Sequence, residues 1–220
     1  MPPENFGDVI LQIDVLLFSV VFHEVSHGWV AERCGDPTAR FMGRLTLNPV
    51  PHIDLWGSIL LPGILVLTHS PILFGYAKPV PVDQRNLRRP RIDGILVAIA
   101  GPFSNVFLAL VCAVLLGLEA PFLGMGHALS RLLVIGMGTN VMLALFNLLP
   151  VPPLDGSWLL EHTLRGAAYN AYRAVRPYGI LILLGIMLFP PVAYYVMYIP
   201  RQFLLGQLMS VSQAIAGLVS

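Results

Sequence analysis

The order of hydrophobic and polar residues along the chain predicts several long helices of membrane-spanning length. Crossing the hydrocarbon core of a bilayer takes about 20 mostly apolar residues. The stretches that meet this requirement are 8–33, 92–118, 128–150 and 178–199. We therefore predict a helix that spans the membrane in each of them.

Two shorter apolar stretches are less regular. Residues 57–74 are interrupted by Pro62-Gly63 and Ser70-Pro71, which makes a clean helical span improbable and predicts a segment that enters the membrane and turns back. Residues 203–219 carry polar side chains at helical spacing opposite apolar ones. This pattern fits either a helix lying at the membrane interface or a short final span packed on the others.

Composition supports the membrane assignment. Hydrophobic residues make up 56% of the 220 residues and charged residues only 11%, and the mean hydropathy is +0.74; an ordinary globular domain has about 25% charged residues. These values exclude a soluble cytosolic enzyme, a nucleic-acid binder and a disordered chain. The predicted fold is an all-α polytopic membrane protein with about 4–6 transmembrane helices and a re-entrant or β-like segment around 57–82.

Basic residues predict the orientation. Of the 13 Lys and Arg residues, eight lie from Arg33, the last residue of the first long stretch, to Arg91, just before the second, and three lie between the third and fourth. Positively charged loops stay in the cytoplasm. Both groups can be cytoplasmic only if residues 57–74 enter and leave the membrane on one side, which places the N-terminus outside. The first stretch is too long for a signal-peptide core and is expected to remain as a span.

The first stretch contains His23-Glu24-Val25-Ser26-His27, the H-E-x-x-H pattern. Residues four apart on a helix project from the same face, so both imidazoles can bind one Zn²⁺. Glu24 is then placed to take a proton from a zinc-activated water. Three ionisable groups inside a span are costly to insert into a membrane and indicate a functional site.

A catalytic zinc site usually has three protein ligands, so a third is needed. The candidates are His52, His69, His127, His162 and the carboxylates, and Asp155 is the strongest because it follows three prolines that break a helix at a span end. The alternative is that Asp155 caps the helix that follows. Ligation by Asp155 together with His23 and His27 requires the first and third long helices to run in the same direction.

Several motifs resemble those of the site-2 protease family of intramembrane zinc metalloproteases. They are HEVSH (23–27), RLTLNPVPHIDLWGSILLP (44–62), FGYAKPVPVD (74–83), GPFSN (101–105) and NLLPVPPLDG (147–156). The resemblance, to compact prokaryotic members in particular, covers roughly residues 20–165 in the family's order. It implies that His23, His27 and Asp155 are zinc ligands and that Glu24 is the general base, and we expect no PDZ or C-terminal regulatory domain.

The same resemblance implies residues that contact the substrate. Asn105 and Asn147 match asparagines that the family places around the substrate, although each can instead satisfy a helix carbonyl or a neighbouring helix. The segment near 74–82 resembles the family's membrane-associated β element. Two prolines in this segment, Pro79 and Pro81, forbid a helix and predict an extended edge open to a substrate strand. The residues expected to contact the substrate there are Tyr76, Ala77, Lys78, Val80 and Val82. We expect His52 and Asp54 to contact each other rather than the metal.

These observations predict a membrane-embedded zinc endopeptidase that cleaves transmembrane protein or peptide substrates near the cytoplasmic face of the cell membrane. We expect residues 1–220 to form a single domain with a core of roughly 8–168 and C-terminal helices over 178–220. The partners are the lipid bilayer and the substrate, with no nucleic acid. Two alternatives remain, an intramembrane metal transporter and a pseudoprotease that only binds membrane helices.

Overall fold

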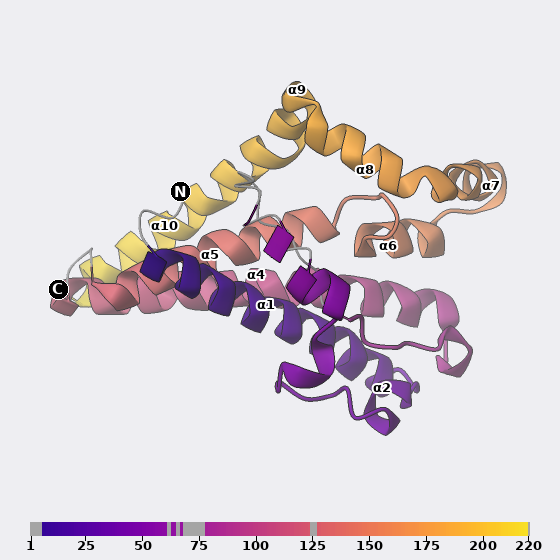
Figure 1. Ribbon diagram of the computed structural model, residues 1–220, viewed down its shortest axis with the longest axis horizontal. Helices are drawn as coiled ribbons and strands as arrows, with labels where there is room; N and C mark the ends of the chain where they lie inside the picture. The colour runs from indigo at the N-terminus through magenta and orange to yellow at the C-terminus, as the bar shows by residue number, and fades with distance from the viewer. Residues whose placement is uncertain (1–5, 61–62, 65–66, 68–77, 124–126, 220) are drawn as a thin grey trace.

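The computed structural model describes residues 6–60, 63–64, 67, 78–123 and 127–219 of the chain. Within these ranges the secondary structure is helical and no strand occurs, which confirms the predicted all-α fold (Figure 1). The α-helices are α1 (Phe6–Arg33), α2 (Thr38–Phe41), α4 (Pro90–Leu123), α5 (Ala128–Asn147), α6 (Asp155–Thr163), α7 (Gly166–Val175), α8 (Gly179–Leu188), α9 (Pro190–Ala193) and α10 (Ile199–Val219). Short 3₁₀ or π-helical turns lie at η1 (Val50–His52), η2 (Leu55–Leu60), η3 (Gln84–Asn86), η4 (Arg176–Tyr178) and η5 (Tyr194–Tyr198).

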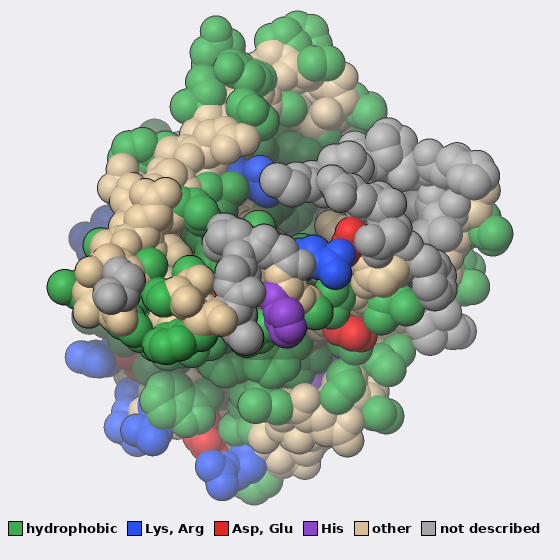
Figure 2. Space-filling view, turned by 90° about the vertical axis from the view of Figure 1, so that its left-hand side faces the viewer, with side chains coloured by type: hydrophobic (Ala, Val, Ile, Leu, Met, Phe, Trp, Pro, Cys, Tyr) green, Lys and Arg blue, Asp and Glu red, His purple; other side chains and the backbone are tan. Residues whose placement is uncertain are grey.

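In the part of the chain that the structure describes, five helical segments are long and apolar enough to cross a membrane. They are Gly7–Arg33, Pro90–Phe122, Ala128–Asn147, Gly166–Leu188 and Pro190–Val219. Large hydrophobic side chains are exposed on them, as with Phe103 on α4 and Leu181 on α8, and hydrophobic side chains cover much of the described surface on the face shown in Figure 2. Such a surface suits a lipid environment, and the chain is a multi-pass membrane protein.

The helices α1, α4 and α5 form the centre of the molecule, and their directions follow from the residues that meet. On α1 and α5, Asp8 pairs with Arg131 and Ser19 accepts a hydrogen bond from Asn140, so the two helices run in the same direction. On α1 and α4, His27 contacts Val97 while Ser19 lies beside Asn105, so these helices are antiparallel. The parallel course of α1 and α5, visible in Figure 1, is the one that a shared metal site requires.

The chain returns to the same end of the molecule between α1 and α4. The Arg88 N–H donates to the carbonyl of Cys34 (3.0 Å), and Ala31, Leu87 and Val97 form one buried cluster. A single complete membrane crossing between these helices is incompatible with that placement. This agrees with the predicted re-entrant course of 57–74, although 61–62, 65–66 and 68–74 lie outside the described residues.

A buried carboxylate fastens the two ends of this connection. Asp36 accepts hydrogen bonds from the Asp83 N–H (2.7 Å), from Asn86 (2.9 Å) and from Thr38. Burial raises the pKa of Asp36, but these hydrogen bonds outweigh it and hold the pKa below its usual value. The carboxylate therefore stays ionised and ties the turn after α1 to residues 83–86.

The prediction of one span over 178–199 is wrong. Helix α8 ends at Leu188, Phe189 is extended, and a new helix starts at Pro190. The two consecutive prolines lack the N–H groups that would continue α8, so the chain turns back at α9, the apex in Figure 1.

Residues 203–219 belong to α10, which packs against α4. The close contact of Gly117 with the Ser212 carbonyl and with Ile215 allows this packing. This packing agrees with the second alternative for this stretch, a final span packed on the other helices.

Candidate metal centre

Two histidines of α1 and one aspartate at the start of α6 bring three ligand atoms together. The His23 Nε2 and His27 Nε2 atoms lie 3.1 Å apart, and Asp155 Oδ2 lies 3.1 Å from the first and 3.3 Å from the second. Among the described residues this is the one group of three or more His, Cys, Asp or Glu side chains able to hold a metal ion. Both histidines are buried, and the aspartate is half-buried.

The hydrogen bonds of the two imidazoles determine where their lone pairs point. His23 Nδ1 lies 2.6 Å from Asn105 Oδ1, and His27 Nδ1 lies 2.6 Å from the Val97 carbonyl oxygen. A carbonyl oxygen only accepts, so the proton of each neutral ring is on Nδ1. Both Nε2 atoms therefore direct lone pairs at each other and at the Asp155 carboxylate.

This arrangement of electron pairs requires a cation between them. Asp155 Oδ2 is buried and accepts no hydrogen bond, so the protein itself does not compensate its charge. Nitrogen and oxygen ligands about 2.0–2.1 Å from a tetrahedral zinc lie about 3.3 Å from one another, close to the separations seen here. The donor set and its spacing fit Zn²⁺, the cofactor of this centre.

Gly101 of α4 permits the close approach of that helix to both imidazoles. A Cβ atom at this position would lie 2.3 Å from His27 Nε2 and 2.5 Å from His23 Nε2. Real Cβ atoms do not occur at such distances, so every other residue would displace the rings or separate α1 from α4. The glycine of GPFSN is thus explained by the space that the two imidazoles need.

Asp155 is positioned by the way the chain turns after α5. The helix ends at Asn147, ahead of the prolines, and Gly156 packs so closely on the carbonyls of Leu148 and Leu149 that a Cβ would lie 2.3–2.4 Å from them. Asp155 is the first residue of α6, the cap position is Leu154, and no side chain caps this helix. The capping alternative is therefore not observed, and ligation by Asp155 stays a prediction that this geometry supports.

Glu24 lies next to the two histidines on α1 and is held by the extended segment 78–82. Its Oε2 accepts a hydrogen bond from the Val80 N–H (2.7 Å). Val80 is buried against Gly28 of α1, where a Cβ would lie 2.8 Å from Val80 Cγ1. The carboxylate of the expected general base is thus oriented by a backbone amide from a distant part of the sequence.

The segment 78–82 is itself fastened to the loop before it. The Lys78 N–H donates to the His52 carbonyl (2.8 Å), and the Arg44 guanidinium donates to the carbonyls of Lys78 (2.6 Å) and Pro79 (3.3 Å). Because Glu24 already accepts from the Val80 N–H, a substrate strand pairs with this amide only by displacing that carboxylate.

The other predicted substrate contacts fall in different places. Asn105 lies behind His23 and bonds to it, and Asn147 donates to the Leu143 carbonyl of its own helix (3.0 Å). Val82 packs on the cluster of Ala31, Leu87 and Val97. Tyr76 and Ala77 lie outside the described residues. Substrate contact by all of these residues stays a prediction.

The remaining histidines serve other contacts. His52 is buried with Nε2 2.9 Å from the Thr46 carbonyl, and burial lowers its pKa, which keeps the ring neutral. Asp54 accepts hydrogen bonds from the N–H groups of Trp56 and Gly57. His162 packs on Gly94 of α4, and His127 precedes α5 as its cap, while His69 lies outside the described residues.

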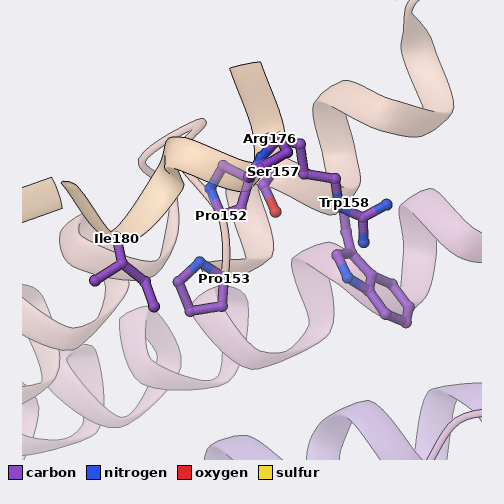
Figure 3. A pocket seen from close by; sticks show the side chains of 7 residues that line it. Pro152, Pro153, Ser157, Trp158, Arg176 and Ile180 are labelled. Carbon is purple, nitrogen blue, oxygen red and sulfur yellow. The ribbon is translucent and has the colours of Figure 1, made fainter. Parts of the chain in front are cut away.

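A surface pocket of about 470 Å³ lies beside the loop that carries Asp155 (Figure 3). One part of it is lined by Pro152, Pro153, Ser157 and Trp158. The other part is lined by Arg176, Pro177 and Ile180, where η4 leads into α8. None of the metal-binding group lines it, so this pocket is separate from the centre.

Sequence reasoning did not identify Asn140 and Ser19, which lie behind Asn105 in a buried network. A single Asn or Ser inside a predicted span carries no spacing signal, and its partners on other helices are set only by the three-dimensional packing. Gly101 belongs to the GPFSN motif, but the motif alone does not reveal that this glycine contacts the imidazoles.

Comparison with known proteins gives consistent relatives. The model of peptidase family M50 matches residues 12–124 and 119–189. YwhC of Bacillus subtilis is 39% identical over 189 residues (83% of this chain and 82% of that protein), and Rip2 of Mycolicibacterium smegmatis is 33% identical over 192 residues (86% and 71%). MJ0611 of Methanocaldococcus jannaschii is 27% identical over 162 residues (71% and 73%). Each of the three bears the name "Putative zinc metalloprotease", and no solved structure matches the chain.

Proposed function

The chain belongs to peptidase family M50, the site-2 protease family of zinc metalloproteases, and on that premise we propose that it cleaves peptide bonds within or near the transmembrane segments of other proteins. One observation carries the proposal. The donor atoms of His23, His27 and Asp155 converge, and Glu24 lies next to the two histidines in a helix long and apolar enough to cross a membrane. We further propose that residues 1–220 form one domain, with a core of roughly 8–168 followed by the C-terminal helices.

Each residue of the centre has a distinct part in the proposed reaction. His23 and His27 would hold the zinc ion as neutral imidazoles, and Asp155 would add a negative charge. The ion, when bound, supplies a Lewis acid that lowers the pKa of water towards about 7 and polarises a carbonyl group. Glu24 takes the proton of the attacking water and returns it to the leaving nitrogen.

The amide of Val80 supports this role of Glu24. By donating to Oε2 it leaves the other carboxylate oxygen to receive the proton. The segment that carries this amide is the one expected to pair with an unwound substrate, so we propose that the substrate pairs with other backbone groups of 78–82 while the Val80 amide keeps Glu24 in place.

The composition of the centre argues against the two alternatives. A transporter needs ligands at several depths along a path, whereas the described residues hold one compact group. A pseudoprotease that only binds helices has no need for a complete H-E-x-x-H pattern with a third ligand at bonding distance.

Metal removal tests the proposal. We expect the purified protein to cleave a model substrate with a single transmembrane helix, and a strong chelator to reduce that cleavage below detection. Adding Zn²⁺ in excess of the chelator should restore it, because the apo centre keeps its ligands in place through Asn105 and Val97. Cleavage that continues at the same rate after zinc has been removed and its absence verified would contradict the proposal.

We propose that the centre faces the cytoplasm, since the basic segments flank it. Lys78 is exposed, so a single Cys at this position, with Cys34 and Cys112 replaced by Ser, should react with a membrane-impermeant maleimide only in inside-out vesicles. A single Cys at position 127, exposed at the other end of α5, provides the matched control and should react only from outside. Labelling of position 78 in intact cells would contradict the proposed cytoplasmic orientation.

The same Cys at position 78 tests where the substrate binds. A bound single-span substrate is expected to slow labelling at 78 several-fold. Labelling at an unchanged rate in the presence of substrate would contradict the proposal that the substrate binds along residues 78–82.

A further inference from the structure

Behind His23 lies a network of buried polar side chains that joins three helices. Asn105 of α4, Asn140 of α5 and Ser19 of α1 have 0%, 2% and 1% of their surface exposed. Asn105 Nδ2 donates to Asn140 Oδ1 (2.9 Å) and to the Ser19 carbonyl (3.4 Å). Asn140 Nδ2 donates to Ser19 Oγ and to the Gly136 carbonyl, each at 2.9 Å. The two amide groups therefore use both of their N–H hydrogens.

The backbone fixes the orientation of both side-chain amides in this network. The Gly136 carbonyl only accepts, so Asn140 must turn its NH₂ towards it and its oxygen towards Asn105. Asn105 must then present its NH₂ to Asn140 and to the Ser19 carbonyl, a second pure acceptor. Its oxygen is left facing His23 Nδ1, 2.6 Å away.

We propose that Asn140 and Ser19 are positioning residues that set the tautomer of the zinc ligand His23 through Asn105. The two backbone carbonyls force the side-chain amides into one orientation, and this orientation places the imidazole proton on Nδ1 and the lone pair on Nε2. The inference rests on the zinc site of the proposed function.

The opposite tautomer has no acceptable arrangement. With the proton on Nε2, the Nδ1 lone pair faces Asn105 Oδ1, and turning Asn105 to relieve this brings its oxygen against Asn140 Oδ1 and the Ser19 carbonyl. Turning Asn140 as well sets its oxygen against the Gly136 carbonyl. These groups are buried within membrane-spanning helices, where water is scarce and unpaired polar groups are costly.

The Nδ1-protonated tautomer of His27 is set by a single direct hydrogen bond. Its Nδ1 bonds directly to the Val97 carbonyl, a backbone acceptor of α4. His23 lies one helical turn away and has no such direct bond to a backbone carbonyl. Its Nδ1 instead bonds to Asn105, whose orientation depends on Asn140 and on backbone carbonyls. The network therefore concerns one ligand, and its loss should affect zinc affinity more than the fold of the helices.

Zinc affinity of the purified protein, measured by competition with a chromophoric chelator, tests the inference without relying on activity. Asn105→Leu, which has a similar shape and no acceptor, is expected to weaken zinc binding by about 10–100-fold, the range usual for loss of a metal-supporting hydrogen bond. Asn140→Ala and Ser19→Ala should each weaken it by smaller factors. Asn105→Asp keeps an acceptor for His23 Nδ1–H and should bind zinc more tightly than Asn105→Leu.

A double-mutant cycle separates positioning from simple packing. If Asn140 and Ser19 act through Asn105, adding Asn140→Ala or Ser19→Ala to Asn105→Leu causes no further loss of affinity. Ser104→Ala is the matched control, because this buried neighbour of Asn105 bonds to the Gly101 carbonyl of its own helix and should keep wild-type affinity.

Two results would overturn the inference: additive losses in the double variants, or wild-type affinity in Asn105→Leu. Ser19→Ala removes only a hydroxyl, so it keeps the test available if Asn140→Ala does not yield monodisperse protein. A wild-type protein without zinc, or His23→Ala with undiminished zinc, would instead overturn the zinc site of the proposed function.

Discussion

Glu24→Gln is expected to abolish substrate cleavage while zinc stays bound. The amide has nearly the same size as the carboxylate but cannot accept the proton of water, and loss of a general base typically lowers rates by about 10²–10⁴-fold. Glutamine can still accept the Val80 N–H through its oxygen, so the segment 78–82 should keep its place. Cleavage of a single-span substrate and zinc content, measured on the same preparation, check this expectation.

His23→Ala is the companion variant, since it removes one of the proposed metal ligands and should lose zinc and activity together. The pair separates proton transfer from metal binding, because only the ligand variant changes metal content. Turnover by Glu24→Gln close to that of the wild type would refute the role of Glu24 as general base. Loss of zinc from Glu24→Gln would show instead that this carboxylate supports the metal site.

The metal centre could be predicted because local spacing determines much of it. His23 and His27 meet on any regular helix, and Asp155 was identified by its place after a proline break at the end of a span. The direction of the helices linked these two segments, since α1 and α5 had to be parallel for the three side chains to meet. The pairs Asp8–Arg131 and Ser19–Asn140 have this arrangement.

Other features depend on contacts that no local pattern contains. The hydrogen bond from Val80 to Glu24 joins residues 56 positions apart, and the relay from Asn140 to His23 involves three helices. The break at Pro190 had a local signal in its two prolines, but the high hydropathy of the surrounding residues favoured one continuous span. Hydropathy measures compatibility with lipid and does not detect the missing backbone donors that turn the chain.

Gly101→Ala is expected to have the second-largest effect, from the addition of a single methyl group. The new Cβ would lie 2.3 Å from His27 Nε2 and 2.5 Å from His23 Nε2, where the ligand atoms converge. The imidazoles must then rotate away, or α4 must move away from α1 and stretch the bonds from His23 to Asn105 and from His27 to Val97. Misplacement of about 1 Å in a catalytic site costs about 100-fold in rate, so we expect activity to fall by at least that factor and zinc affinity to fall with it.

Gly206→Ala is the matched control for this substitution. Gly206 lies within α10, and beyond the backbone of its own helix and its chain neighbours no atom of the described residues lies within 4 Å of the added Cβ, so the change should leave zinc binding and cleavage unaltered. Replacing a glycine inside a helix by alanine otherwise raises helix propensity. Thermal unfolding of the zinc-free proteins distinguishes the two sites, because the general gain in helix propensity applies at both positions and the steric conflict only at Gly101. Wild-type zinc affinity in Gly101→Ala would mean that α4 does not approach the imidazoles as closely as described, and the geometric basis of the centre would fail.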